Sequence, residues 1–151
     1  MSIDINNEAL DQLQLIIDKE SLNNRLHLQQ ADLNTDYDCI TGQFDIVLAT
    51  VSLQFLKPEN ITNLLLKLQS VSAKNAFHHI IIPIQNNIFT LPKSFKYLPE
   101  SRSLYDIYQN NGWSIAEYKE QPGQLAKKDD SGKPIQGIFA QLIAQKCFNS
   151  A

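Results

Sequence analysis

One carboxylate near the start of the chain stands where nucleotide chemistry would need it. The residues Met1-Ser2-Ile3-Asp4 predict a short strand that ends at Asp4, and a helix follows at once. In nucleotide-binding α/β domains, a carboxylate at such a strand end accepts hydrogen bonds from ribose hydroxyls, roughly 20 residues after a glycine-rich loop. Asp4 is therefore a candidate ribose ligand. The alternative interpretation is that it caps the helix that begins near Asn6.

Two further polar residues follow predicted strands. Asp32 comes after a strand expected over residues 25–30, and Thr50 ends the apolar run Phe44–Thr50. Local sequence alone favours an ordinary turn residue at Asp32 and an ordinary strand end at Thr50.

The remaining reactive residue types form no catalytic or metal-binding pattern. Cys39 and Cys147 belong to no CxxC pair or His/Cys cluster, which argues against zinc, a disulfide scaffold and a cysteine nucleophile. His78 and His79 lie in an apolar segment that predicts a buried strand, so we expect one to pack in the core and the other to be partly solvated. The sequence thus assigns no catalytic residue and no metal ligand.

Composition limits the class of partner. The chain has 151 residues, of which 43% are hydrophobic, and a formal net charge of −3, which suits one globular domain over residues 1–151. The sequence has no basic patch, so we do not expect it to bind nucleic acid. It also has no long apolar run, so we do not expect it to enter a membrane. Two unpaired cysteines are typical of a reducing compartment, so we expect a cytoplasmic protein.

Hydrophobic periodicity predicts an α/β chain. The expected order is strand, helix, strand, loop, strand, helix, strand, helix, strand, strand. Helices are expected over residues 6–22, from Pro58 to Val71, and from Ser101 or Ser103 to Gly112; strands are expected over 25–30, Phe44–Thr50, 77–84, 113–119 and 137–147, with a long loop over 85–100. Continuous apolar strands indicate burial on both faces, so a mostly parallel sheet with a C-terminal antiparallel hairpin is predicted.

Three segments resemble the tellurite-resistance (TehB) family of class I S-adenosylmethionine-dependent methyltransferases, which have a Rossmann-like sheet. They are Phe44-Asp45-Ile46-Val47-Leu48-Ala49-Thr50-Val51 with Phe55-Leu56, Ala31-Asp32-Leu33-Asn34, and Gly123-Gln124-Leu125 with Asp130-Ser131-Gly132-Lys133 and Phe139-Ala140. They occur in the family's order and spacing over nearly the whole chain. The resemblance implies methyl transfer from S-adenosylmethionine to a small or soft acceptor.

The resemblance also implies roles for five residues. Asp4 matches the residue that binds the ribose hydroxyls. Asp32 and Leu33 match the turn that meets the adenine, and Thr50 and Val51 match the strand end near the methionine part of the cofactor.

The chain departs from the family pattern in two places. No Gly-x-Gly loop is present, so the first strand and its loop are expected to be missing and S-adenosylmethionine to bind weakly. In the C-terminal hairpin, Ala126 and Pro134 stand where the family has a His and an Arg. The alternative function is therefore a degenerate, non-catalytic domain that acts in binding or assembly.

A missing central strand would have a structural consequence. It would leave unpaired backbone groups beside Asp4 and beside Phe44–Thr50, and such edges recruit other strands. We therefore expect a homo-oligomer rather than a monomer.

Overall fold

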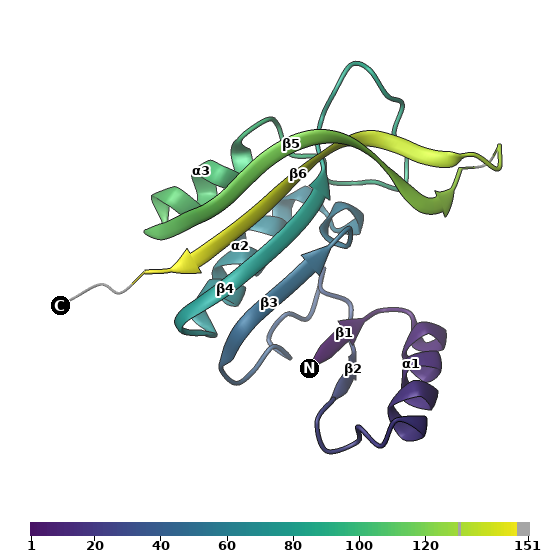
Figure 1. Cartoon of the computed structure of the whole chain (residues 1–151), viewed down its shortest axis with the longest axis vertical. Coiled ribbons are helices and arrows are strands. Elements are labelled where there is room, and N and C mark those ends of the chain that lie inside the picture. The colour runs from purple at the N-terminus through teal and green to yellow at the C-terminus, as the bar shows by residue number, and fades with distance from the viewer. Residues whose placement is uncertain (130, 148–151) are drawn as a thin grey trace. The chain divides into compact units, whose positions relative to one another are not determined.

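Two units make up the computed structural model, which describes residues 1–129 and 131–147. The first unit is Met1–Thr41 and the second is Gly42–Ala151. The single domain expected over residues 1–151 therefore stays a prediction. The strands and helices follow the expected order and are traced in Figure 1.

The first unit is a helix beside a small parallel sheet. Its elements are β1 (Ser2–Asp4), α1 (Asn7–Lys19) and β2 (Leu28–Gln30). Strands β1 and β2 pair in parallel, with Asp4 opposite Gln30. Asn6 caps α1, because its side-chain oxygen accepts from the free N–H groups of Glu8 and Ala9. Leu10 and Ile17 are buried on the inner face of this helix.

The second unit is built on a four-stranded mixed sheet. Its elements are β3 (Phe44–Thr50), the short 3-10 helix η1 (Leu53–Phe55), α2 (Pro58–Ser70), β4 (Ser72–Pro83), α3 (Ser103–Asn110), β5 (Trp113–Lys128) and β6 (Pro134–Lys146). The strand order is β3-β4-β6-β5. Strand β3 pairs with β4 in parallel, and β6 is antiparallel to both of its neighbours. Three strands thus share one direction, and the chain closes in the predicted antiparallel hairpin.

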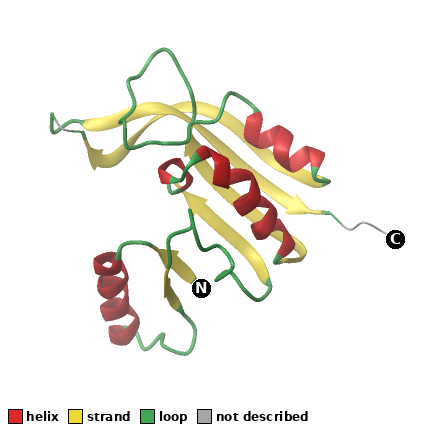
Figure 2. Ribbon diagram, turned by 180° about the vertical axis from the view of Figure 1, so that it is seen from behind, coloured by secondary structure: helices red, strands yellow, loops and turns green. Residues whose placement is uncertain are grey.

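Helices α2 and α3 cover the same face of this sheet (Figure 2). Alternation along each strand directs its buried side chains to that face. The core residues there come from both helices and from the two central strands: Ile61, Leu64, Leu65, Leu104, Tyr108, His78, Ile80, Ile82, Ala140, Leu142 and Ala144.

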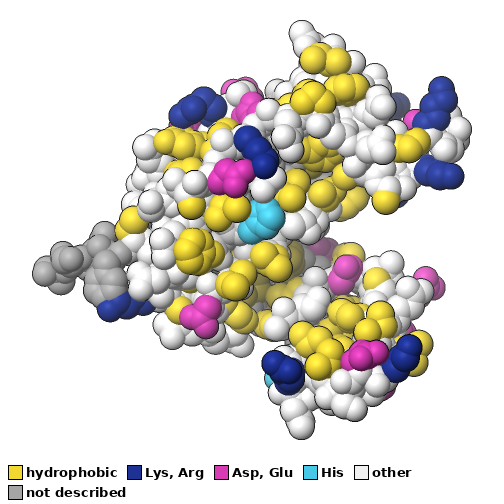
Figure 3. Space-filling model, viewed as in Figure 1, with side chains coloured by type: hydrophobic (Ala, Val, Ile, Leu, Met, Phe, Trp, Pro, Cys, Tyr) yellow, Lys and Arg dark blue, Asp and Glu magenta, His cyan; other side chains and the backbone are white. Residues whose placement is uncertain are grey.

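The opposite face carries exposed apolar side chains. Ile46, Leu48 and Phe77 are 63%, 67% and 39% exposed. They belong to β3 and β4, and their register places Ile46 opposite Phe77. Figure 3 shows hydrophobic side chains gathered over this part of the sheet, around one histidine.

Several predicted ends of helices and strands were wrong. Helix α1 stops at Lys19, because Ser21 takes a positive φ. Strand β2 begins only at Leu28, since the N–H groups of Arg25 and Leu26 bond back to the carbonyl of Leu22 as a turn. Neither Ser101 nor Ser103 caps α3; the cap residue is Arg102, in the left-handed region.

Strands β4, β5 and β6 also exceed their predicted bounds. The hairpin is longer than expected because β5 continues through Pro122 and Gly123, which pair with Ile138 and Gly137 of β6. Proline is tolerated there since β5 is the edge strand, where a missing donor costs no ladder bond. Strand β4 begins at Ser72, through a polar segment that hid it from the hydrophobic pattern. Asp130, in the predicted turn, lies outside the described residues.

Candidate functional site

The carboxyl ends of the two strands of the first unit carry three of the predicted site residues. Asp4 ends β1, and Asp32 and Leu33 follow β2 directly. The N–H of Ala31 donates to the carbonyl oxygen of Asp4 over 3.1 Å, so the two strand ends lie side by side. The structure therefore brings these residues to one edge of the sheet.

The carboxylate of Asp4 has a local structural role and spare capacity. Its Oδ1 accepts from the N–H of Asn6 over 2.8 Å, which steadies the turn into α1. The helix cap itself is Asn6, so the cap interpretation of Asp4 is wrong. Within residues 1–129 and 131–147, Oδ2 of Asp4 has no hydrogen-bond partner. An exposed carboxylate oxygen at this strand end is free to accept from hydroxyl groups.

Asp32 organises the turn after β2. Its Oδ1 accepts from the N–H of Asn34 over 2.9 Å and from the Nδ2 of the same residue over 3.0 Å. Its carbonyl oxygen accepts from the N–H groups of Thr35 and Asp36. The turn interpretation is therefore correct for the backbone, and it holds the half-buried Leu33 at the edge beside Asp32.

In the second unit, Thr50 and Val51 lie where β3 ends. Thr50 is exposed at the last strand position. Val51 has a φ of 55°, which is the left-handed region that a β-branched residue rarely enters. Such strain, of order 1–3 kcal/mol, persists only where surrounding contacts impose it, and it is common at binding sites.

Two hydrogen bonds impose this conformation. The N–H of Val51 donates to the carbonyl oxygen of Ile81 over 2.8 Å, and the Nε2 of Gln54 donates to the carbonyl oxygen of Val51 over 2.8 Å. Gln54 is fully buried, and its backbone carbonyl oxygen accepts from the N–H groups of Lys96 and Tyr97. Gln54 thus ties the end of β3 to the long loop after β4.

Gln54 also has an unsatisfied polar atom. Its Oε1 is buried and has no hydrogen-bond partner among the described residues. A buried acceptor without a partner is costly, and such atoms are uncommon in folded proteins. Sequence reasoning missed Gln54, because a glutamine between Leu53 and Phe55 gives no local signal of burial.

The two histidines of β4 occupy the environments that the sequence predicted. His78 is fully buried and His79 is half-buried. His78 lies between Ser72 and Tyr108, with its ring 4.4 Å from that of Trp113. Burial, aided by the charge of Lys146, lowers the pKa of His78 to about 4. It is therefore a neutral core residue, closed off from any ligand.

Two features of the described residues concern membranes and metal ions. Within that part of the chain, no helix is long and apolar enough to cross a membrane. In the same residues, no group of three or more His, Cys, Asp or Glu side chains could hold a metal ion.

The fold is that of a Rossmann-like methyltransferase. The crystal structure of TehB from Haemophilus influenzae superposes with a TM-score of 0.84 at 25% identity, covering 96% of this chain and 49% of that one. Magnesium protoporphyrin IX methyltransferase from Synechocystis, solved with bound S-adenosylhomocysteine, gives a TM-score of 0.63 at 15% identity, over 95% of this chain and 62% of that one. The second likeness shows the fold alone.

The chain belongs to the TehB family. The family described as "Tellurite resistance protein TehB" matches residues 1–143. A relative named "Probable S-adenosyl-L-methionine-dependent methyltransferase TehB", from Haemophilus influenzae strain 10810, is 26% identical over 145 residues. The match covers 96% of this chain but 49% of the relative, so the chain spans about half the length of that protein. The family resemblance read from the sequence is thereby confirmed.

Proposed function

We propose that this chain acts in S-adenosylmethionine-dependent methyl transfer of the TehB type, to a small or soft small-molecule acceptor in the cytoplasm. The observation that carries the proposal is the family match over residues 1–143, together with the carboxylates at the strand ends of the first unit. The named methyltransferases among its relatives favour this function over a non-catalytic binding role.

The described residues fit the adenosyl part of the cofactor. Oδ2 of Asp4 is free to accept from ribose hydroxyls, and the ordered Asp32 turn offers an acceptor for the adenine amine. Leu33, beside it, provides an apolar wall for the base. These three roles follow the family pattern residue by residue.

Thr50 and Val51 are proposed to lie near the methionine part of the cofactor. The positive φ of Val51 turns the backbone sharply out of β3, and the bond from Gln54 holds that turn in place. When bound, the cofactor supplies an electrophilic methyl group on a sulfonium centre. Such a transfer needs mainly alignment of donor and acceptor and exclusion of water.

Binding of S-adenosylhomocysteine to the whole chain tests the proposal. We would follow it by two-dimensional NMR, which detects weak binding, and compare Asp4→Asn with Asp11→Asn. Asp11 is an exposed carboxylate of α1 in the same unit, bonded to the side chain of Asn7. The Asp4 variant should bind about tenfold more weakly or worse, since a hydrogen bond to a charged group contributes about 1.5–3 kcal/mol. An equal effect of the two substitutions would show that Asp4 has no part in binding.

A further inference from the structure

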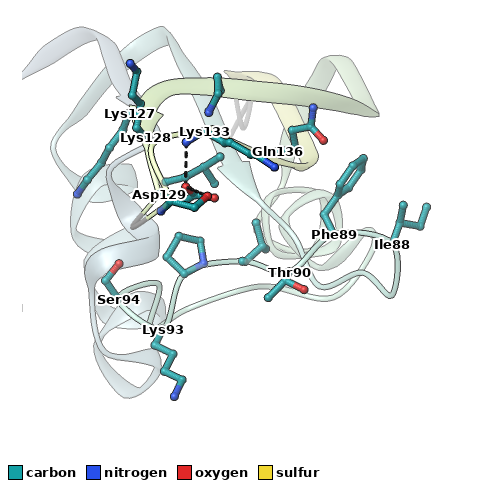
Figure 4. Close-up of a pocket in the computed structure, with 15 residues that line it drawn as sticks. Ile88, Phe89, Thr90, Lys93, Ser94, Lys127, Lys128, Asp129, Lys133 and Gln136 are labelled. Carbon is teal, nitrogen blue, oxygen red and sulfur yellow. Dashed lines mark hydrogen bonds between the residues drawn. The ribbon is translucent and has the colours of Figure 1, made fainter.

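An open pocket of about 1010 Å³ lies between the distal end of the β5–β6 hairpin and the loop that follows β4. Residues 88–94 of the loop line one side, and residues 127–129, 131 and 133–136 of the hairpin line the other (Figure 4). Both walls belong to the second unit. A pocket of this size holds a small organic molecule.

The loop wall is held in place by two contacts. The Oδ1 of Asn86 accepts from the N–H groups of Ile88 and Phe89, over 3.0 and 2.7 Å. A Cβ atom at Gly137 of β6 would lie 3.0 Å from the Cδ2 of Leu91, so glycine there lets the loop pack directly on the hairpin. The pocket is therefore a formed feature of the fold rather than the space under a loose loop.

The hairpin wall is positively charged. Lys127, Lys128 and Lys133 line it, in a chain whose formal net charge is −3. In the part of the chain that the structure describes, none of the three forms an ion pair; Lys127 instead lies 5.6 Å from the ring centre of Phe55. Lys93 also lines the pocket, but its side chain extends away from the hairpin (Figure 4).

The one described carboxylate of the lining is engaged in its own turn. Oδ1 of Asp129 accepts from the N–H and Oγ of Ser131 and from the N–H of Lys133, at 2.9, 2.7 and 3.0 Å. The bond from the Ser131 hydroxyl contributes most to lowering the pKa of Asp129, so this group is ionised and turned toward the backbone. Three hydrogen bonds within the turn thus hold the Asp129 carboxylate, which also feels the charge of Lys133.

The loop wall carries apolar side chains at its start. Ile88 and Phe89 lie on it, across from the lysines (Figure 4), and Ile88 is 70% exposed. Leaving so large an apolar side chain in water forgoes the free energy of its burial. A ligand with an apolar body would cover it.

From these two walls we propose that the pocket binds a small organic anion: a phosphate or carboxylate group held by Lys128 and Lys133, on an apolar body that packs against Ile88 and Phe89. Lysine ammonium groups suit such anions as mobile point charges. Binding does not depend on methyl transfer.

Calorimetric titration of the whole chain at low ionic strength tests the site, with phenyl phosphate, inorganic phosphate and phenol as probes. Phenyl phosphate should bind most tightly, inorganic phosphate more weakly, and phenol not measurably, because the charge and the apolar body each contribute. Added salt should weaken the binding, since exposed charges are screened. Failure of phenyl phosphate to bind up to about 10 mM, or equal binding of phenol, overturns the proposal.

Matched variants separate the two walls. The double variant Lys128→Gln/Lys133→Gln should weaken the binding of phenyl phosphate and of inorganic phosphate about tenfold. The control Lys19→Gln/Lys119→Gln makes the same change of net charge elsewhere and should leave both affinities unchanged. Lys119 is paired with Glu117 at 2.8 Å, outside the pocket. Ile88→Ser should weaken the binding of phenyl phosphate but not that of inorganic phosphate. Equal loss in the two lysine pairs would show that only net charge matters, and would overturn the site. Because no cofactor is present, failure here is distinct from failure of S-adenosylhomocysteine to bind.

Discussion

Nδ1 of His78 lies 2.6 Å from the hydroxyl oxygen of Tyr108, in the buried layer beneath α3. The Oγ of Ser72 lies 2.7 Å from the Nε2 of the same ring and donates its one hydrogen to the carbonyl of Leu68. Nε2 must therefore carry the ring proton, and Nδ1 accepts from Tyr108. A second proton, on Nδ1, would take the place of the hydrogen that the Tyr108 hydroxyl donates. The resulting positive charge on the ring would also be disfavoured by the charge of Lys146.

The first prediction is that stability falls on acidification because of His78. Its pKa in the folded protein is about 4, below the ordinary value of 6.5, so the unfolded chain binds more protons between these two pH values. The contribution of neutral His78 to the free energy of unfolding is complete above pH 6.5. It falls by on the order of 3 kcal/mol as the pH is lowered to about 4. Urea unfolding at about pH 5 and about pH 7 measures it. His78→Gln should flatten this dependence, while His27→Gln should retain it; the same slope in both would contradict the assignment.

The second prediction concerns the backbone strain at Val51. Glycine adopts a positive φ without penalty, so Val51→Gly should be more stable than Val51→Ala by about 1 kcal/mol. Val47, in the middle of β3, has no positive φ and serves as the control position. There the alanine variant should be the more stable of the pair. Chemical denaturation of the four variants measures the difference, and the same order at both positions would show that Val51 is not strained.

The third prediction is that S-adenosylmethionine binds this chain weakly. The five glycines are Gly42, Gly112, Gly123, Gly132 and Gly137, and they form no Gly-x-Gly loop to receive the cofactor's carboxylate. Each missing charge-assisted hydrogen bond forgoes about 1.5–3 kcal/mol. Titration calorimetry should therefore give a dissociation constant well above the low micromolar range. A low micromolar constant would mean that other backbone groups replace the loop.

The fourth prediction is self-association through β3. Among the described residues, β3 pairs only with β4 and leaves its other edge without a partner strand. Antiparallel pairing of two copies about a two-fold axis at Val47 would place Ile46 opposite Leu48 and Asp45 opposite Ala49. The exposed apolar side chains would then meet, and no like charges would face each other.

Light scattering at several concentrations measures this association. The apparent mass should rise with concentration, and Ile46→Lys/Leu48→Lys should abolish the rise. Leu15→Lys/Ile16→Lys adds the same charges to exposed apolar positions of α1 and should not abolish it. A monomer at every concentration would rule out an open edge at β3.

The sequence by itself determined the order of elements, the family and the positions of the candidate residues. Local patterns were sufficient for these, because the apolar run Phe44–Thr50 predicts a strand and the proline at the start of α2 predicts helix initiation. The burial expected for Phe44–Thr50 on both faces was wrong, since β3 is an edge strand on which Ile46 and Leu48 are exposed. The roles assigned to Asp4, Asp32, Leu33, Thr50 and Val51 remain predictions. Their places at strand ends were nevertheless readable from the chain alone.

Only the tertiary structure decided the contacts that depend on residues distant in sequence. The positive φ of Val51 depends on the bond from its N–H to the carbonyl oxygen of Ile81, a residue of β4 that is distant in sequence. The extension of β5 through Pro122 depends on its place at the sheet edge. The lysine pocket likewise required the loop after β4 to fold back onto the hairpin. Such features arise from long-range packing, in which a side chain's environment is set by neighbours that the local sequence does not contain.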